Sequence, residues 1–233
     1  MAAFLGNSPS MALISANTKG SAGTGDRLLA CVAEQGSAAH SYPTSVALLR
    51  GPQAARNLSD VVHYLCMLHG RYPGVVDHAA LCCVDPAARS WAESATEGFG
   101  VERAFLARLA VAAGPVPGTP GSADSEAAVI GQRHALEMLA QSERNGCALG
   151  AALALVADWA VVRRVLDAAA ARFGVEPPPF QLGDREKLRK VAGEIAALAP
   201  VERALLFGGE QIVIQHFGLW SLLESRQQAR GDS

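Results

Sequence analysis

The stretch CALGAALALVADWAVVRRVLDAAAARF, residues 147–173, decides the fold class of this chain. It is the most apolar segment of the sequence, and its alanines and leucines are strong helix formers. The unbroken apolar run from Cys147 to Ala157 ends at Asp158, and it is shorter than the roughly 20 residues that a membrane-spanning helix needs. The pattern therefore predicts a buried central helix with no role in a membrane.

Helical periodicity continues on both sides of this segment. Ser90 and Glu93 form a capping-box pattern, and Asp184 suits an N-cap position. The Gly/Pro-rich residues 114–121 and the prolines at 177–179 predict connections, because proline ends helices. The sequence predicts helices over residues 26–34, 44–50, 53–69, 75–82, 91–113, 125–143, 147–173, 185–198 and 201–226.

The expected fold class is therefore all-α, a single multi-helix bundle of about eight helices over residues 26–233. Residues 211–217 offer the one alternative, since Ile212, Val213 and Ile214 are β-branched and suit a strand. No other segment offers a partner strand, so helix remains the prediction there. Residues 1–25 are rich in Gly, Ser, Asn and Ala, which predicts an N-terminal arm.

The amino-acid composition indicates which kinds of binding partner and which cellular compartment to expect. Half of the residues are hydrophobic, 18% are charged and the net charge is −2. The chain has no run of lysines and arginines, so the sequence predicts no binding of nucleic acid. Its five cysteines are an odd number and no secretion signal precedes them, which favours a reduced, cytoplasmic setting.

Four ionisable residues fall on the apolar faces of predicted helices: His69, Glu102, Asp158 and His216. A buried carboxylate or imidazole is costly unless it is paired or neutral. One interpretation is that some of them meet in an interior pocket as general acid/base groups or metal ligands. The other is structural, with core histidines bonded to carbonyl groups and Glu102 paired with a nearby arginine such as Arg103 or Arg108.

His134 is a fifth candidate for this pocket, because it lies at the boundary of an apolar face between Ile130 and Met138. Its neighbours Arg133 and Glu137 are polar, so a solvated position on the helix surface is the alternative interpretation.

A metal site is a separate hypothesis. Cys66 and His69 stand three residues apart on one predicted helix, and His78 and Cys82 stand four apart on the next. Both spacings place two ligands on one helix face, and a helical hairpin could bring the pairs together. The same cysteines also suit core positions, since free Cys is commonly buried.

No sequence motif assigns a cofactor. The chain has no phosphate-binding glycine loop, no GxSxG and no Glu-x-x-His pair of the kind found in di-iron bundles. Function must therefore be argued from the arrangement of side chains.

The size and helix order of residues 53–226 resemble the heme-oxygenase/TenA-like superfold. The resemblance rests on a few landmarks along the chain, namely His69-Gly70, Pro73, Asp77, the glycines at 146 and 150, and His216. It implies a central cavity for a small molecule or cofactor. The Gly-rich distal-helix motif of heme oxygenases is absent, and Cys147 cannot be matched to the nucleophile of TenA-type thiaminases. The resemblance therefore implies no particular reaction.

Two functions remain open. The first is a small-molecule-binding or enzymatic helical domain, whose internal pocket touches at least two of the five candidates. The second is a non-enzymatic homodimeric interaction protein, in which buried polar residues only fix the register of the helices. That second function needs an exposed apolar helix face.

Overall fold

The computed structural model describes residues 22–231, and no strand occurs among them, which confirms the all-α class. The predicted N-terminal arm lies outside the described residues up to residue 21, and the first helix begins at Thr24. The α-helices are α1 (Thr24–Gln35), α2 (Val46–Leu49), α3 (Ala54–His69), α4 (Val75–Cys82), α5 (Pro86–Ala113), α6 (Ser122–Ala140), α7 (Cys147–Phe173), α8 (Arg185–Ile195) and α9 (Ala199–Gly231), with a 3-10 turn at Tyr42–Thr44.

Most predicted helices are present, but several limits differ. α5 begins at Pro86, because Asp85 caps it by accepting the backbone N–H of Ala88; the predicted start at Trp91 is wrong. Residues 211–217 lie inside α9, which confirms the helical prediction for that segment. Of its three β-branched side chains, those of Ile212 and Val213 are fully buried in the core, and that of Ile214 is exposed.

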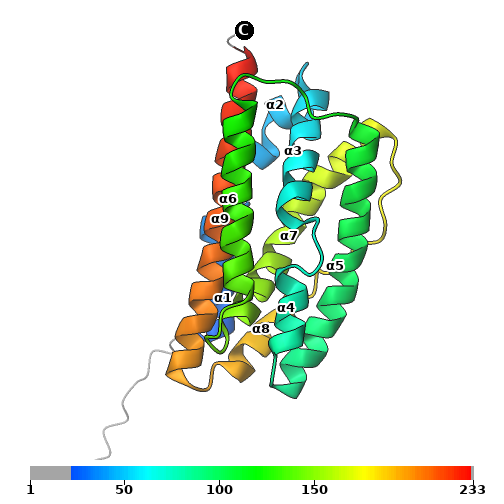
Figure 1. Cartoon of the computed structure of the whole chain (residues 1–233). Coiled ribbons are helices and arrows are strands. Elements are labelled where there is room, and N and C mark those ends of the chain that lie inside the picture. The colour runs from blue at the N-terminus through cyan, green and yellow to red at the C-terminus, as the bar shows by residue number, and fades with distance from the viewer. Residues whose placement is uncertain (1–21, 232–233) are drawn as a thin grey trace, which may run out of the picture.

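The helix α7 occupies the centre of the bundle and contacts α1, α3, α4, α5, α6, α8 and α9. Figure 1 shows α6 and α9 side by side along one edge and α5 along the opposite edge. The core is built mainly from Leu, Val and Ala, with a few large rings such as Trp159 and Trp220. Within residues 22–231, no helix is both long and apolar enough to cross a membrane.

The helices α7 and α9 approach each other through two glycines. A Cβ atom added to Gly150 would lie 1.9 Å from the carbonyl oxygen of Leu205, and one added to Gly208 would lie 2.1 Å from that of Cys147. No side chain fits at either distance, so only glycine allows this contact. The close packing fixes α9 against the central helix, and α9 carries one member of the site described next.

Candidate functional site

Three of the predicted residues meet in the core, although they come from three helices. Nε2 of His69 (α3) lies 2.8 Å from Nε2 of His216 (α9), and Nδ1 of His216 lies 2.5 Å from Oδ2 of Asp158 (α7). All three side chains are buried. The residues therefore form one continuous hydrogen-bonded chain.

The connection after α1 completes the environment of Asp158. The backbone N–H of Ser37 donates to Oδ1 at 2.9 Å, and the Ser37 hydroxyl donates to Oδ2 at 2.5 Å. The indole N–H of Trp220 in turn donates to the Ser37 oxygen at 2.7 Å. Gly36 permits this approach, since a Cβ there would lie 2.5 Å from Oδ1 of Asp158. We call His69, His216, Asp158, Ser37 and Trp220 the His–Asp network.

The hydrogen bonds restrict where the protons of this network lie. Three groups are directed at Asp158, and its two oxygens act as the acceptors. His216 then carries a proton on Nδ1 and, while neutral, accepts at Nε2 from the Nε2–H of His69. In that arrangement the Nδ1 atom of His69 has a free lone pair. The geometry therefore leaves a basic nitrogen at the outer end of the network.

Burial lowers the pKa of His69 well below its ordinary value of 6.5, and the nearby His216 and Arg103 lower it further. Desolvation disfavours the charged imidazolium, and a neighbouring cation adds repulsion. His69 is consequently neutral near pH 7. A neutral imidazole can accept a proton, as a general base must.

Glu102 lies next to this network and has its own partners. Its carboxylate accepts the indole N–H of Trp159 at 3.0 Å and a guanidinium N–H of Arg163 at 2.6 Å. The Trp159 ring also packs edge-on against His69, with the ring centroids 5.5 Å apart. Burial raises the pKa of Glu102, and the Trp159 and Arg163 bonds oppose that rise. The expected pairing with Arg103 or Arg108 is wrong, because Arg163 of α7 reaches Glu102 from across the core.

Arg103 is engaged elsewhere. It forms a two-pronged ion pair with Asp77, at 2.7 Å and 2.9 Å. Asp77 also accepts the backbone N–H of Gly74 at 2.6 Å and so caps the start of α4. This pair holds the turn between α3 and α4 against α5.

The other predicted ligands are not brought together. The side chain of His134 is 73% exposed and lies 3.7 Å from the carboxylate of Glu137, so it faces solvent and not the core. No group of three or more His, Cys, Asp or Glu side chains within residues 22–231 is placed to hold a metal ion. The four residues of the metal hypothesis, Cys66, His69, His78 and Cys82, therefore do not converge in this structure.

A small cleft reaches the outer end of the His–Asp network. Its volume is about 40 Å³, and among the five candidate pocket residues it touches only His69. We call it the His69 cleft; its lining includes Leu68, His69, Arg71, Gly74, Val75, His78, Phe99, Arg133 and Glu137. The sequence predicts a cavity that touches at least two of the candidates, and the His69 cleft does not meet that expectation. His69 is hydrogen-bonded directly to His216, and the ring of Trp159 packs beside His69, so no open space separates these side chains.

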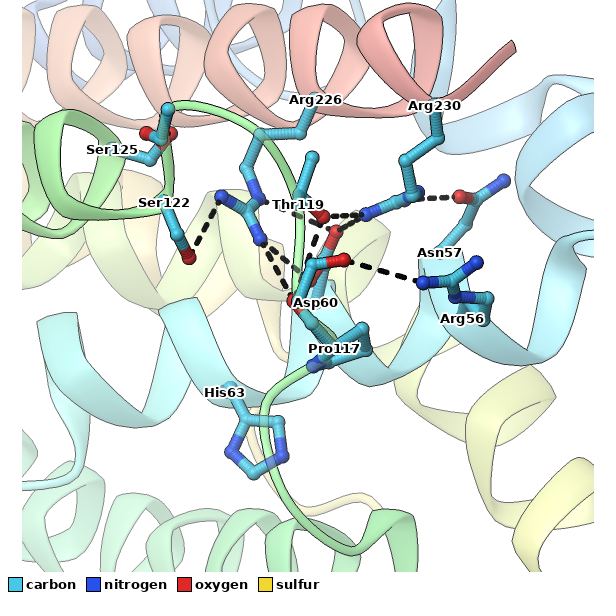
Figure 2. A network of polar contacts seen from close by, with 12 residues as sticks. Arg56, Asn57, Asp60, His63, Pro117, Thr119, Ser122, Ser125, Arg226 and Arg230 are labelled. Carbon is cyan, nitrogen blue, oxygen red and sulfur yellow. Dashed lines mark hydrogen bonds and ion pairs between the residues drawn. The ribbon is translucent and has the colours of Figure 1, made fainter. Parts of the chain in front are cut away.

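A second buried polar network lies near the C-terminal end of α9, and none of its residues is among the predicted site residues (Figure 2). Arg226 donates to both oxygens of Asp60, at 3.3 Å and 3.2 Å, and Arg230 donates to Asp60 and to Asn57. Arg230 also donates to the hydroxyl of Thr119, in the loop before α6, at 2.9 Å. We call these five residues the Asp60–arginine network. Its signal was helical spacing: Asn57 and Asp60 share one face of α3, and Arg226 and Arg230 share one face of α9.

A family of unknown function, DUF6975, has a model that matches residues 32–231. The chain belongs to this family. The match includes every member of both networks, but the family description names no activity. No curated protein and no solved structure matches the chain. The comparisons therefore add no support to the heme-oxygenase/TenA-like resemblance, and they leave function to be argued from the two networks.

Proposed function

We propose that this chain binds a small anionic molecule in the His69 cleft and exchanges a proton with it. The observation that carries the proposal is the hydrogen-bonded chain from Asp158 through His216 to His69, whose outer residue lines the cleft. A buried carboxylate behind an imidazole fixes the tautomer of that imidazole and stabilises its protonated form. Here a second imidazole extends the same arrangement towards the cleft.

The proton route follows from the geometry. A proton released by the ligand binds Nδ1 of His69, and the proton on Nε2 of His69 moves 2.8 Å along the hydrogen bond to Nε2 of His216. The positive charge then rests on His216, next to the ionised Asp158. Reversal of the two steps returns a proton to the ligand. His69 can thus act as a general base and then as a general acid without holding the charge itself.

The lining of the cleft favours an anion. Arg71 and Arg133 contribute two positive charges to it, and Glu137, its one carboxylate, lies 4.0 Å and 3.5 Å from them and offsets one of the two. The helix α4 begins at its edge with Val75. A helix N-terminus adds partial positive charge. A volume of about 40 Å³ holds two or three water molecules, so only a small reacting group, such as a carboxylate, fits beside His69.

The test is an NMR titration of the purified protein with acetate and with inorganic phosphate, in which the imidazole ¹⁵N signals are followed. We expect the His69 signals to shift saturably with one of the two anions. His69→Gln should abolish the binding, Asp158→Asn should change the tautomer of His216, and the exposed-site control His134→Gln should change neither. Imidazole signals of His69 that stay unchanged with both anions up to about 10 mM, a range that detects millimolar affinities, would overturn the proposal.

The resemblance to the heme-oxygenase/TenA-like superfold supports a ligand site between helices but not a large cofactor. The His69 cleft is far smaller than the roughly 300–1,000 Å³ of pockets that hold drug-sized ligands. A heme or another large cofactor has no room there. The inference that remains from the resemblance is a ligand held between helices.

Self-association is a second candidate function, and an exposed apolar face supports it. Met138 on α6 and Phe207 on α9 are 64% and 40% exposed, and both line a groove between these helices. Ile130, Ile214 and Phe217 are exposed on the same two helices. A homodimer would bury this face. Sedimentation of the wild type and of Met138→Glu tests it: a concentration-dependent dimer lost in the variant supports the proposal, and a monomer throughout contradicts it.

We also propose a cytoplasmic location and a single helical domain. Within residues 22–231 all five cysteines are free thiols, which suits the reducing cytoplasm. The sequence pattern predicts an N-terminal arm over residues 1–25 and a single domain over 26–233; because α1 begins at Thr24, we propose that the domain begins there and that the arm ends before it. Limited proteolysis followed by mass spectrometry checks both, with early cleavage expected before Thr24 and later cleavage elsewhere.

A further inference from the structure

The Asp60–arginine network carries an unbalanced buried charge. Arg226 is 3% exposed, Asp60 is 1% exposed, and the side chain of Arg230 is 5% exposed. Two guanidinium groups therefore share one carboxylate, which leaves one net positive charge out of water. Arginine does not release its proton in proteins, so this charge cannot be removed by titration.

The donors of this region also outnumber its acceptors. Nε of Arg230 is buried with no hydrogen-bond partner within the described residues, and the buried hydroxyl of Tyr64 has only Ser122 nearby as a polar partner. Tyr64 is fully buried beneath the guanidinium of Arg226, whose central carbon lies 4.8 Å from the ring centroid. Two further bonds of Arg226, to Ser122 and to the carbonyl oxygen of Pro117, are long at 3.5 Å. Unpaired buried donors are costly, so a group with several acceptor atoms would lower the energy of this region.

A loop covers the network and supplies weak acceptors to it. Figure 2 shows residues 114–121 passing over Asp60, with Pro117 and Thr119 turned towards the arginines. The loop is held at two more points, because Arg56 donates to the carbonyl of Gly118 at 3.2 Å and His63 lies 2.8 Å from that of Gly114. It leads into the N-terminus of α6, where Ser122 is the first residue.

We infer that this region is an oxyanion-binding site, in which Arg226, Arg230, Tyr64 and Ser122 hold a phosphate group. The arginines supply charge and paired N–H donors, which match a tetrahedral oxyanion. The two hydroxyl groups and the first turn of α6 supply further donors on one side. The Pro117 carbonyl and the Thr119 hydroxyl occupy the acceptor positions here, so the anion replaces them and moves the loop outward.

The acidic residues nearby do not neutralise the positive charge of the two buried arginines. Asp124 and Glu126 lie in the first turns of α6, but both are exposed to solvent, which screens their charge. Asp60 is the only buried carboxylate in the group, and it orients both guanidinium groups from the side of α3. A purely structural clamp would explain the ion pairs but gives no role to the buried, unpartnered Nε of Arg230.

The experiment is calorimetric titration of the full chain with inorganic phosphate, with sodium chloride as the reference, compared with Tyr64→Phe. The variant keeps the ring beneath the Arg226 guanidinium and loses only the hydroxyl near Ser122. We expect its thermal midpoint without phosphate to stay close to that of the wild type and its phosphate affinity to fall about tenfold. Arg230→Lys should weaken binding further, because lysine lacks the paired donors.

Two controls keep the result interpretable. Arg27→Gln removes an exposed arginine that pairs with Glu202 near the other end of α9, and it should leave phosphate affinity unchanged. His69→Gln should also leave it unchanged, which separates this site from the His69 cleft. Equal phosphate affinity in wild type and Tyr64→Phe, or no binding to the wild type at 10 mM, which corresponds to about the weakest useful affinity, would overturn the inference.

Discussion

The two buried networks differ in the kind of charge that they hold. The His–Asp network contains imidazoles, whose protons can move near neutral pH. The Asp60–arginine network contains two guanidinium groups, whose charge is fixed. Both connect α9 to α3, through His69 and His216 in one case and Asp60 and Arg226 in the other. One helix pair thus carries a network that can transfer protons and a network that can only hold charge.

This difference separates chemistry from binding. A network with movable protons can change its protonation when a ligand arrives, as general acid–base catalysis requires. A network with fixed charge can change only its partners, and this suits recognition of an anion. The four predictions that follow compare the networks, in order of decreasing expected effect.

Asp60→Asn should have the largest effect on stability. It leaves two guanidinium groups buried without a carboxylate, so we expect a loss of about 3–5 kcal/mol in the free energy of unfolding. The loss should be the same at pH 5.5 and pH 8, because arginine does not titrate there. Urea unfolding at both pH values measures it, with the half-exposed Asp26→Asn as control. A strongly pH-dependent loss would show that the charge of this network is not fixed.

Asp158→Asn should cost less, about 1.5–3 kcal/mol at pH 7. The amide still fills the space, and neutral imidazoles need no counter-charge, but the charge-assisted bonds from His216 and Ser37 are lost. Urea unfolding gives the value, with Asp167→Asn on the same helix as control, since Asp167 forms an ion pair at the surface and should change stability by about 0.5 kcal/mol or less. A loss as large as that of Asp60→Asn would contradict the difference between the two networks.

The pH dependence of stability should come partly from His69. Its folded pKa is lowered by burial from 6.5, so below that pH the unfolded chain binds a proton that the folded chain does not. Stability is complete above about pH 6.5 and falls as the pH decreases below it, by about 1.4 kcal/mol per pH unit for this one group. The pKa of His40 is also lowered by burial and acts in the same direction. His69→Gln should flatten the profile by one proton, while Asp60→Asn should leave its slope unchanged.

The smallest expected effect is the coupling between the networks. His216 and Arg226 are ten residues apart on α9, which corresponds to about 15 Å along the helix. The unfolding free energies of Asp158→Asn and Tyr64→Phe should therefore add to within about 0.5 kcal/mol in the double variant. A double-mutant cycle measures the difference. Coupling above 1 kcal/mol, twice the usual limit of additivity, would show that the two networks act as one unit.

The fold class followed from the sequence because helical periodicity and the apolar segment at 147–173 depend only on local pattern. The core positions of Glu102, Asp158, His69 and His216 followed for the same reason. Their partners did not follow. Which helix faces which is decided by packing over long sequence separations, so Arg163 was not identified as the partner of Glu102.

The predictions that the structure contradicts also depend on packing that a local sequence pattern does not reveal. The helix α5 begins at Pro86, five residues before the predicted start at Trp91. Asp85 caps it and Pro suits the first helical turn, so this start competes with the one that Ser90 predicts. His134 was placed at a pocket because it lies next to apolar residues, but those residues, Ile130 and Met138, are themselves exposed. The sequence pattern does not predict the Asp60–arginine network, because arginines are usually at the surface and their burial cannot be recognised from helical periodicity.

The glycine contact between α7 and α9 makes α9 a fixed reference for distance measurements. With backbone atoms already touching at Gly150 and Gly208, α9 cannot slide along α7 without separating from it. A spin label on an exposed position of α9 such as Gln228 therefore stays in a constant frame. A second label at Gly118, where a Cβ atom would meet nothing within 4 Å, then reports the displacement of the covering loop alone, so the distance distribution between the two labels directly measures its opening.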